Sequence, residues 1–314
     1  MAGFEVPVLG LELGSGLGYM LCLVAIWAII GRVYPLISLV RSWLPRGSLG
    51  KRYGQGSWAV VTGASRGLGR GFCQALAQAG FNIVLISRGN TQALATNLEA
   101  TYKVQTRTLQ KDFAGKGADL RTFYEGISAD LEDLDVSILV NSVGVAYDGL
   151  FAKEPIQELV DTVEINVLPM VFLTRWALNR MQKRQKRSAI INISSLSGLI
   201  PYAGFAIYCA SKRFNDAFSI ALAHETDISP DLPVDILSLR PSYVHTDMIA
   251  GLKVQAEPAN TVSVEACVEG TLNALGRGKY TAGTFRHTWV IAAALRHREE
   301  EESKGYLAAL PERV

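Results

Sequence analysis

The sequence predicts a single doubly wound α/β domain with a parallel sheet, preceded by an N-terminal helix that anchors it to a membrane. Three observations lead to this expectation. Short runs of Val, Ile and Leu alternate with longer amphipathic segments, a glycine-rich turn follows the first of these runs, and 19 residues near the N-terminus carry no charge. Continuous apolar strands are typical of a parallel sheet whose two faces are both covered by helices.

The expected strands are six apolar runs, each bounded by turn residues: Trp58–Thr62, Asn82–Ser87, Val104–Leu109, Val136–Asn141, Ala189–Ser194 and Val234–Leu239. Helices are expected between and after them, at about 68–79, 91–101, 118–128, 156–182, 205–226 and 263–275. Such alternation after a glycine-rich turn predicts a doubly wound sheet within one domain. The chain then divides into a membrane anchor with an interfacial segment (1–44), a linker (45–56), the α/β domain (57–285) and a C-terminal tail (286–314).

The uncharged run spans residues 13–31 and is followed by Arg32 and Arg41. At about 1.5 Å per residue, a helix of this length just crosses a hydrocarbon core of about 30 Å. The residues before it include Glu5 and Glu12 but no Lys or Arg, so the basic start of a cleaved signal peptide is missing. Basic residues after the run place the following domain in the cytosol by the positive-inside rule. A buried or interfacial helix is the alternative.

The charge balance gives no general argument for a nucleic-acid partner, because 31 Lys and Arg stand against 29 Asp and Glu, a net charge of +2. The four cysteines, at positions 22, 73, 209 and 267, lack the spacing of metal ligands or of a disulfide framework. They indicate a reducing compartment and no metal site. The basic run 183–187 is expected to end a helix and lie in solvent, with nuclear targeting or membrane-surface contact as alternatives.

The glycine-rich turn lies between the first expected strand and the first expected helix. Its glycines let the backbone turn tightly and approach a pyrophosphate, which then accepts hydrogen bonds from free N–H groups at the positive end of the helix. A glycine triplet alone is a weak signal, but its place between a strand and a helix strengthens it. The turn therefore predicts a dinucleotide cofactor. The contacts expected in it are Thr62, Gly63, Ser65, Arg66, Gly67, Leu68 and Gly69.

The second expected strand ends in Ser87 and Arg88, with no carboxylate. In doubly wound sheets an acidic residue at this point binds the ribose 2′-OH of NAD, whereas an arginine accommodates the 2′-phosphate of NADP. Arg66 in the glycine-rich turn is placed to reach the same phosphate, so two guanidinium groups and a hydroxyl would bind a dianion. The sequence therefore favours NADP(H).

Tyr208 and Lys212 lie four residues apart and share one face of an expected helix. The ammonium group is expected to lower the pKa of the phenol from its ordinary value of about 10. Ser195 follows an apolar run and would present its hydroxyl at the carboxyl end of a strand. These three side chains suit proton donation to a carbonyl oxygen while a cofactor delivers hydride.

Five motifs in order resemble those of the short-chain dehydrogenases/reductases, over about residues 57–250. They are the turn Thr62–Gly69, the segment Asn141–Gly144, Asn166, Ser195 and the pair Tyr208 and Lys212. The leading anchor and the segments 84–88, 138–144 and 241–246 resemble one membrane-bound branch of this family. That branch contains very-long-chain 3-oxoacyl-CoA reductases of the endoplasmic reticulum and 17β-hydroxysteroid dehydrogenases. The resemblance implies a Rossmann domain that binds a nicotinamide dinucleotide.

The resemblance also implies a role for each matching residue. Tyr208 would be the general acid, Lys212 would lower its pKa and bind the nicotinamide ribose, and Ser195 would polarise the carbonyl. Asn166 would hold a water that links Lys212 to solvent. The remaining implied cofactor contacts are Ser87, Arg88, Asp112, Asn141, Gly144, Tyr208, Lys212, Pro241, Val244 and Thr246. The chain departs from the family pattern in having Asn-Ser-Val-Gly at 141–144, where Asn-Asn-Ala-Gly is usual, and Ser242 where glycine is frequent.

By resemblance, the expected reaction is the NADPH-dependent reduction of a (very-)long-chain 3-oxoacyl-CoA to the 3-hydroxyacyl-CoA in fatty-acid elongation. The expected location is the endoplasmic reticulum membrane, with the catalytic domain facing the cytosol. Homodimers would pair through the helices at about 156–182 and 205–226. A 17β-hydroxysteroid or retinoid dehydrogenase is one alternative, and a catalytically silent membrane adaptor that retains the nucleotide fold is another.

Overall fold

The computed structural model describes residues 5–6, 11–12, 20, 22, 47–115, 117–250 and 261–296. The chain divides into two compact units, Met1–Leu44 and Pro45–Val314. In the first unit β1 (Glu5–Val6) pairs antiparallel with β2 (Leu11–Glu12). The anchor helix predicted for 13–31 lies almost entirely outside the described residues. Within the described part of the chain, no helix has both the length and the apolar character needed to cross a membrane.

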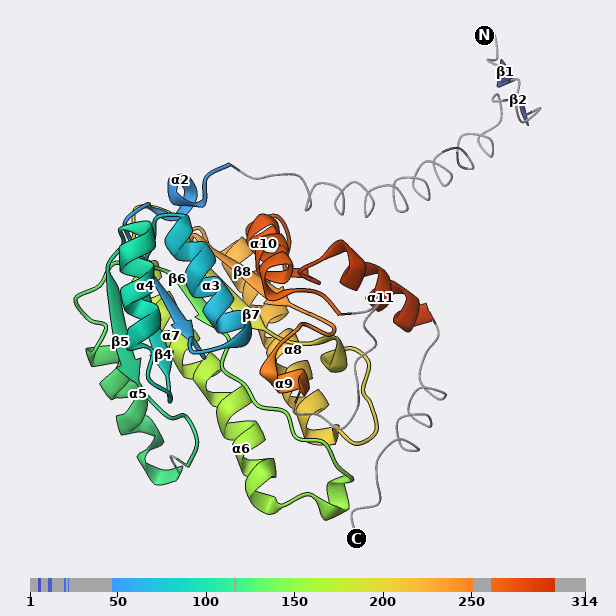
Figure 1. Cartoon of the computed structure of the whole chain (residues 1–314). Coiled ribbons are helices and arrows are strands. Elements are labelled where there is room, and N and C mark those ends of the chain that lie inside the picture. The colour runs from blue at the N-terminus through green and yellow to red at the C-terminus, as the bar shows by residue number, and fades with distance from the viewer. Residues whose placement is uncertain are drawn as a thin grey trace. The chain divides into compact units, whose positions relative to one another are not determined.

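Seven parallel strands form the sheet of the second unit, in the order β5-β4-β3-β6-β7-β8-β9 (Figure 1). Their bounds are β3 Trp58–Thr62, β4 Asn82–Ser87, β5 Thr106–Gln110, β6 Val136–Asn141, β7 Ser188–Ile193, β8 Val234–Leu239 and β9 Tyr280–Thr281. From β3 the chain adds β4 and then β5 on one side. It then returns to the other side of β3 and adds β6, β7, β8 and β9 outward in turn. The second unit is therefore a doubly wound α/β domain, which confirms the predicted fold class for this part. A ligand crevice is expected outside the carboxyl ends of the strands, where the order reverses between β3 and β6.

Helices cover both faces of the sheet (Figure 1). The buried side chains of a strand alternate between the two faces. One face packs against α3 (Gly67–Gln78), α4 (Gln92–Tyr102) and α10 (Val264–Ala274). The other packs against α5 (Leu120–Ala129), α6 (Ile156–Asn166), α7 (Leu168–Met181) and α8 (Ala206–Ile228). In β3, Ala59 and Val61 belong to the first core and Val60 to the second, and all three are fully buried. Burial on both faces explains why the strands read as unbroken apolar runs.

The single helix predicted at about 156–182 is in fact two helices. α6 ends at Asn166, and α7 begins at Leu168 with Pro169 in its first turn. Proline lacks an N–H group and fixes its own φ angle, so it suits the first turn of a new helix and disrupts the interior of one. The break leaves Asn166 at the end of α6, where it is buried.

The segment 45–56, predicted to be a linker, contains α2 (Leu49–Tyr53), which packs on the domain. The Tyr53 side chain is fully buried, and its hydroxyl donates a hydrogen bond to the Asp235 carboxylate at 2.7 Å. Arg52 and Arg187 pair with the same carboxylate, also at 2.7 Å. Burial alone would raise the pKa of Asp235, but hydrogen bonds from these three side chains lower it. The segment is therefore a fixed part of the fold.

The basic run 183–187 also differs in part from its prediction. Arg184 has a side chain only 10% exposed, and it pairs with the Asp135 carboxylate at 2.6 Å. It also donates to the Tyr53 carbonyl oxygen at 3.2 Å. With Arg187 on Asp235, the run links the start of β7 to α2, while its other members are exposed as expected.

The α/β domain extends past its predicted end at residue 285. β9 pairs with β8 and forms the edge of the sheet, although no strand was expected there. α11 (Phe285–Arg296) follows β9, and its His287 is fully buried. A short helix, α9 (Asp247–Ala250), follows the loop after β8. The segment after residue 285, predicted as a tail, thus begins with a helix whose His287 is buried in the domain.

Candidate active site

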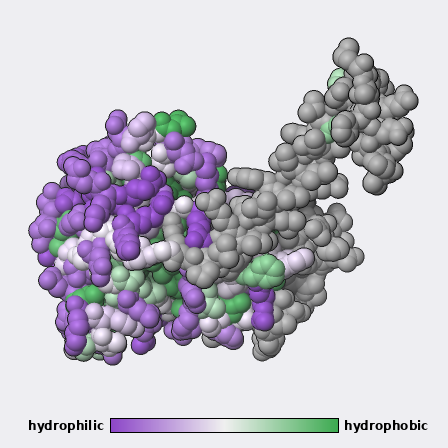
Figure 2. Space-filling model, turned by 90° about the horizontal axis from the view of Figure 1, so that it is seen from above, coloured by the Kyte–Doolittle hydropathy of each residue, from purple (hydrophilic) through white to green (hydrophobic). Residues whose placement is uncertain are grey.

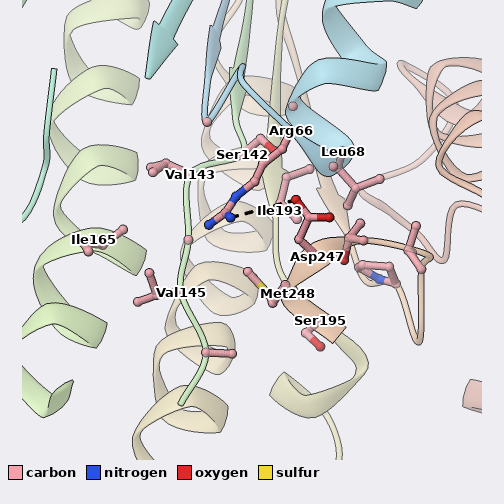
Figure 3. A pocket seen from close by; sticks show the side chains of 18 of the residues that line it. Arg66, Leu68, Ser142, Val143, Val145, Ile165, Ile193, Ser195, Asp247 and Met248 are labelled. Carbon is pink, nitrogen blue, oxygen red and sulfur yellow. Dashed lines mark ion pairs between the residues drawn. The ribbon is translucent and has the colours of Figure 1, made fainter. Parts of the chain in front are cut away.

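A cavity of about 460 Å³ opens at the carboxyl ends of the central strands, where the strand order reverses. Most of the predicted site residues line it. They are Gly63, Ser65, Arg66, Gly67, Leu68, Gly69, Ser87, Arg88, Asp112, Gly144, Ser195, Tyr208, Lys212, Pro241, Val244 and Thr246. Figure 3 shows the arrangement, with Arg66 and Leu68 from the glycine-rich turn on one side and Ser195 on the other. Thr62, Asn141 and Asn166 are the predicted residues that do not line the cavity.

The glycine-rich turn forms a close backbone cradle at the start of α3. Gly63 and Gly67 have φ angles of +67° and +53°, which favour glycine. A Cβ atom on Gly69 would lie 2.2 Å from the Gly63 carbonyl oxygen, so no other residue fits there. No side chain caps the first N–H groups of α3. Free N–H groups at a helix N-terminus that faces a cavity suit a pyrophosphate.

Thr62 and Asn141, both predicted to contact the cofactor, do not line the cavity, and their side chains hold neighbouring segments of its wall together. The Thr62 hydroxyl oxygen accepts hydrogen bonds from the N–H groups of Ser142 and Val143 at 2.9 and 3.1 Å. The Asn141 amide donates to the Asn192 side chain at 2.8 Å and to a hydroxyl of α7 at 3.0 Å. Both side chains therefore join β3, β6 and β7 where the loops leave the sheet.

The three predicted catalytic side chains converge beside the cavity. Tyr208 and Lys212 come from α8, and Ser195 precedes the 3-10 helix η3 (Leu196–Gly198), directly after β7. Ser195 Oγ accepts a hydrogen bond from the Ser197 N–H at 3.1 Å and hydrogen bonds with Tyr208. Lys212 Nζ lies 5.7 Å from the centre of the Tyr208 ring and donates to the Ile193 carbonyl oxygen at 3.1 Å.

The pKa of Tyr208 differs from the expectation that Lys212 would lower it. Burial raises the pKa of Tyr208 to about 12, and the hydrogen bond with Ser195 opposes this rise only in part. Burial also lowers the pKa of Lys212 to about 8, because a charged ammonium is poorly solvated there. Tyr208 is therefore protonated at neutral pH, as a proton donor must be.

Asn166 lies behind Gly144, on the side of the cavity wall next to Lys212. Its Oδ1 accepts a hydrogen bond from the Val145 N–H at 2.8 Å. Its Nδ2 donates to the Val145 carbonyl oxygen and to Ser211 Oγ, both at 3.0 Å. A Cβ atom on Gly144 would lie 3.2 Å from Asn166 Oδ1 and 3.5 Å from Lys212 Nζ, so glycine keeps open the space between these two groups.

The opposite end of the cavity is polar and basic. Arg88 follows β4, is exposed and has no carboxylate beside it in the chain, while the Ser87 hydroxyl oxygen accepts a hydrogen bond from the Gly89 N–H at 3.3 Å. Arg66 forms a long ion pair with Asp247 of α9, at 4.0 Å, and both side chains are more than 60% exposed (Figure 3). Such a pair is weak in water and leaves the guanidinium free to bind a phosphate. This end suits the adenosine half of a dinucleotide.

The loop 241–246, after β8, borders the catalytic end. Val244 forms a parallel bridge with Val262. The Val262 N–H donates to the Tyr243 carbonyl oxygen at 3.1 Å, and the Val262 carbonyl oxygen accepts from the His245 N–H at 2.9 Å. In a parallel bridge of this kind, the N–H and C=O groups of the middle residue face away from the partner strand. Val244 also lines the cavity, so this bridge fixes one part of the cavity wall.

Sequence reasoning missed the apolar part of the lining. It comprises Val143, Val145, Ile165, Ile193, Leu196, Tyr202, Phe205, Tyr243, Met248 and Ile249. Most of these residues lie in the segments that follow β6, β7 and β8, the same strands that lead into predicted site residues. Their position after these strands is the one sequence signal that would have identified them. Among the described residues, no cluster of His, Cys, Asp or Glu has the arrangement of a metal site. The cavity therefore joins a basic end, a proton-donating group and an apolar wall.

Replacing Lys212 with Met is expected to stabilise the protein at pH 7. The pKa of Lys212 is about 8 in the folded chain against 10.5 for a free lysine, so between these values the unfolded chain binds more protons. The free energy of unfolding of the wild type therefore rises with pH between about 8 and 10.5. Below about pH 8, the destabilisation that comes from burying the charged ammonium is at its full size. The penalty is on the order of 3 kcal/mol, less about 1 kcal/mol for the lost hydrogen bond to Ile193.

Urea unfolding of both proteins from pH 7 to pH 10 measures this effect. The advantage of the variant is expected to shrink as the pH rises. Lys183→Met, at an exposed lysine, is the matched control and should change little at any pH. If Lys212→Met is no more stable than the wild type at pH 7, or if its added stability does not change with pH, the lowered pKa of Lys212 in the folded chain is contradicted.

Known proteins resemble this chain in sequence. Residues 57–257 match the family model described as short chain dehydrogenase. The chain is 40% identical over 228 residues to the very-long-chain 3-oxoacyl-CoA reductase of Aspergillus clavatus, a match that covers 71% of this chain and 63%, less than two thirds, of that protein. It is 34% identical over 260 residues to the human protein of the same name, a match that covers 81% of this chain and 80% of the human protein. It is 32% identical over 280 residues to very-long-chain 3-oxoacyl-CoA reductase-B of Danio rerio, with 86% of each covered.

Solved structures resemble its fold at lower identity. A 7β-hydroxysteroid dehydrogenase matches with a TM-score of 0.72 and 22% identity, covering 83% of this chain and all of that one. A short-chain dehydrogenase from Sphingobium yanoikuyae in complex with NADPH matches with a TM-score of 0.64 and 22% identity, covering 82% and 98%. A 3-oxoacyl-[acyl-carrier protein] reductase from Brucella melitensis in complex with NAD has a TM-score of 0.59 and 23% identity, covering 69% and 88%. These likenesses show the fold alone. From the family match and the converging Ser195, Tyr208 and Lys212, the chain belongs to the short-chain dehydrogenase family and is an oxidoreductase of alcohol and carbonyl groups that uses a nicotinamide cofactor.

Proposed function

We propose that this protein reduces a long-chain or very-long-chain 3-oxoacyl-CoA to the 3-hydroxyacyl-CoA with NADPH, as a step of fatty-acid elongation. The observation that carries the proposal is the apolar cavity wall beside an intact Ser195, Tyr208 and Lys212. The names of relatives that are 32–40% identical to the chain support the same substrate class.

The chemistry divides between the cofactor and the chain. A bound nicotinamide supplies hydride to the carbonyl carbon. The hydroxyl groups of Ser195 and Tyr208 donate hydrogen bonds to the carbonyl oxygen, and the Tyr208 proton passes to it as negative charge develops. The Ser197 N–H holds Ser195 Oγ in place. Lys212, whose pKa is about 8, is close enough to the ring to favour loss of that proton and its later replacement.

The lining next to the catalytic residues supports a lipid-like substrate. Val145, Leu196, Phe205 and Met248 all contribute to this wall, and the phenyl ring of Phe205 lies 5.9 Å from that of Tyr208. Burying apolar groups contributes about 25 cal/mol per Å² of surface removed from water. An acyl chain therefore gains binding energy here that a small polar ketone does not.

The basic end of the cavity supports NADP(H) rather than NAD(H). Arg66 and Arg88 both line it, and β4 ends without the carboxylate that would bind a ribose 2′-OH. Two guanidinium groups bind a 2′-phosphate through charge-assisted hydrogen bonds, each contributing about 1.5–3 kcal/mol. NADPH is then expected to be preferred to NADH by a factor of at least about ten.

A substrate panel on the detergent-solubilised full chain tests the proposal. Initial rates on 3-oxoacyl-CoA esters of increasing chain length are compared with rates on steroid ketones, each with NADPH and with NADH, by following oxidation of the cofactor. The expected result is the highest kcat/KM on a long acyl chain with NADPH. Faster reduction of a steroid ketone rejects the acyl-CoA substrate, and NADPH binding without any turnover favours a silent adaptor.

We also propose that residues 1–44 hold the protein at the endoplasmic reticulum membrane with the second unit on the cytosolic side. The uncharged run 13–31, the basic residues after it and a lipid-like substrate support this location. Alkaline carbonate extraction of membranes from cells that make the full chain is the test. Retention in the pellet is expected, and release into the supernatant rejects the anchor.

A homodimer through α6, α7 and α8 is the third proposal. Val160 and Val163 on α6 and Phe214 on α8 are large apolar side chains that are each 40–42% exposed, and a partner subunit would remove them from water. Most of the described surface seen in Figure 2 is hydrophilic, with only small hydrophobic areas. Analytical ultracentrifugation in detergent is expected to give a dimer, and a monomer across the whole concentration range rejects this pairing.

A further inference from the structure

The loop 241–246 presents Val244 and Thr246 to the cavity, so its position affects cofactor binding. Hydrogen bonds from neighbouring backbone hold most of it. The Leu196 N–H donates to the Pro241 carbonyl oxygen at 2.8 Å, and the bridge to Val262 holds Tyr243 and the residues after it. Ser242 lies between these two supports, at the position where glycine is frequent in the family.

His287 holds this remaining part of the loop from α11. Its Nδ1 accepts a hydrogen bond from the Ser242 N–H at 3.3 Å, and its Nε2 lies 3.1 Å from the Tyr243 carbonyl oxygen. A carbonyl oxygen only accepts hydrogen bonds, so Nε2 carries the proton and Nδ1 is the nitrogen that accepts one. The neutral imidazole therefore binds two adjacent residues of the loop at once, and the ring is fully buried.

The start of α11 fixes where the imidazole lies. The Thr284 hydroxyl oxygen accepts a hydrogen bond from the His287 N–H at 3.1 Å. Before it, Gly283 has a φ angle of +78°, and a Cβ atom there would lie 2.6 Å from Cys267 Sγ of α10. The start of α11 is thus held close to α10 at Gly283, and the Thr284 hydroxyl holds the His287 backbone N–H, so neither support depends on the loop 241–246.

We infer that His287 is a positioning residue that sets the loop 241–246 for the nicotinamide end of the cofactor. When the two hydrogen bonds are removed, Ser242 and Tyr243 shift, and Val244 and Thr246 move with them. Arg66 and Arg88, at the basic end of the cavity, belong to other loops. The contact of Arg66 with Asp247, directly after the loop 241–246, is a long and exposed ion pair of 4.0 Å, so this end is expected to keep its place. The inference rests on the proposed function only in requiring a nicotinamide cofactor, and it is independent of the substrate.

Binding of two probes to the full chain tests this inference. NADPH reaches both ends of the cavity, whereas 2′,5′-ADP lacks the nicotinamide half. His287→Phe keeps the ring volume but forms neither hydrogen bond, so it is expected to weaken NADPH binding by roughly ten- to thirtyfold, since each bond contributes about 1 kcal/mol. The affinity for 2′,5′-ADP is expected to stay within about twofold. The second probe also confirms that the variant is folded.

Two further variants sharpen the result. His287→Asn places an amide oxygen near the position of Nδ1, keeps the bond to Ser242 and is expected to recover part of the affinity. His224→Phe, at an exposed histidine of α8, is the matched control and should bind both probes like the wild type. Equal weakening of both probes, or no weakening of either, overturns the inference. If the wild type prefers NADH, the same comparison with NADH and 5′-AMP applies, so an error in the proposed cofactor is seen separately.

Discussion

Tyr208→Phe is expected to lower kcat by about 100- to 10,000-fold, which is the range of general-acid catalysis. The ring remains, so the packing beside Ser195 and Lys212 is kept, and only the hydroxyl group is lost. Because burial raises the pKa of Tyr208 to about 12, this hydroxyl carries its proton at neutral pH and is the natural donor to the carbonyl oxygen. Steady-state reduction with saturating NADPH measures the loss.

The same variant is expected to bind NADPH within about fivefold of the wild type, because the hydroxyl contributes at most one hydrogen bond of about 1 kcal/mol. Tyr102→Phe, in α4 on the other side of the molecule, removes a hydroxyl outside the cavity and should leave kcat unchanged. Near-normal turnover by Tyr208→Phe would mean that another group supplies the proton. Loss of NADPH binding would instead assign Tyr208 to the cofactor site alone.

Gly69→Ala is expected to abolish measurable cofactor binding, with an affinity loss of more than about 100-fold. A Cβ atom at this position would lie 2.2 Å from the Gly63 carbonyl oxygen and 2.7 Å from its carbon. Both are backbone atoms, so the glycine-rich turn must move away from the start of α3. The N–H groups that face a pyrophosphate then no longer converge, and overpacking of this kind also destabilises a fold by about 1–3 kcal/mol.

Titration with NADPH and urea unfolding measure the two effects of Gly69→Ala. Gly126→Ala is the control, because a Cβ atom on this residue of α5 meets nothing within 4 Å. That change should leave NADPH binding intact and slightly raise stability, since alanine favours a helix by about 1 kcal/mol over glycine. Normal NADPH binding by Gly69→Ala would show that the cofactor does not use this turn.

The central strands of the sheet were predictable because they are buried on both faces. A continuous apolar run between turns marks such a strand directly, and the bounds of β3, β4, β6 and β8 agree with the runs. Residues that follow those strands then meet at one edge, so the convergence of Ser195, Arg88 and the glycine-rich turn was also predictable. The local sequence pattern was sufficient wherever a single strand and the loop after it determine where a site residue lies.

Interactions between distant segments were not predictable in this way. Asn141 has the residue type expected of a cofactor contact, but its amide binds Asn192, 51 residues away. Tyr208 and Lys212 have helical spacing, yet burial dominates both pKa values, and burial is a property of the folded chain. His287 gives no signal in the sequence, because its role depends on a loop 44 to 45 residues earlier.

The hydrogen bonds of α2 determine where a shortened version of the protein can begin. A chain that starts at Trp58 lacks the Tyr53 ring, which leaves a hollow in the core, and lacks two of the three side chains that bind Asp235. A buried carboxylate that keeps only Arg187 as a partner and an unfilled hollow each destabilise the domain, the hollow by about 2–5 kcal/mol. Truncation should therefore preserve everything from Leu49 onward, even though the family motifs start only at the first strand.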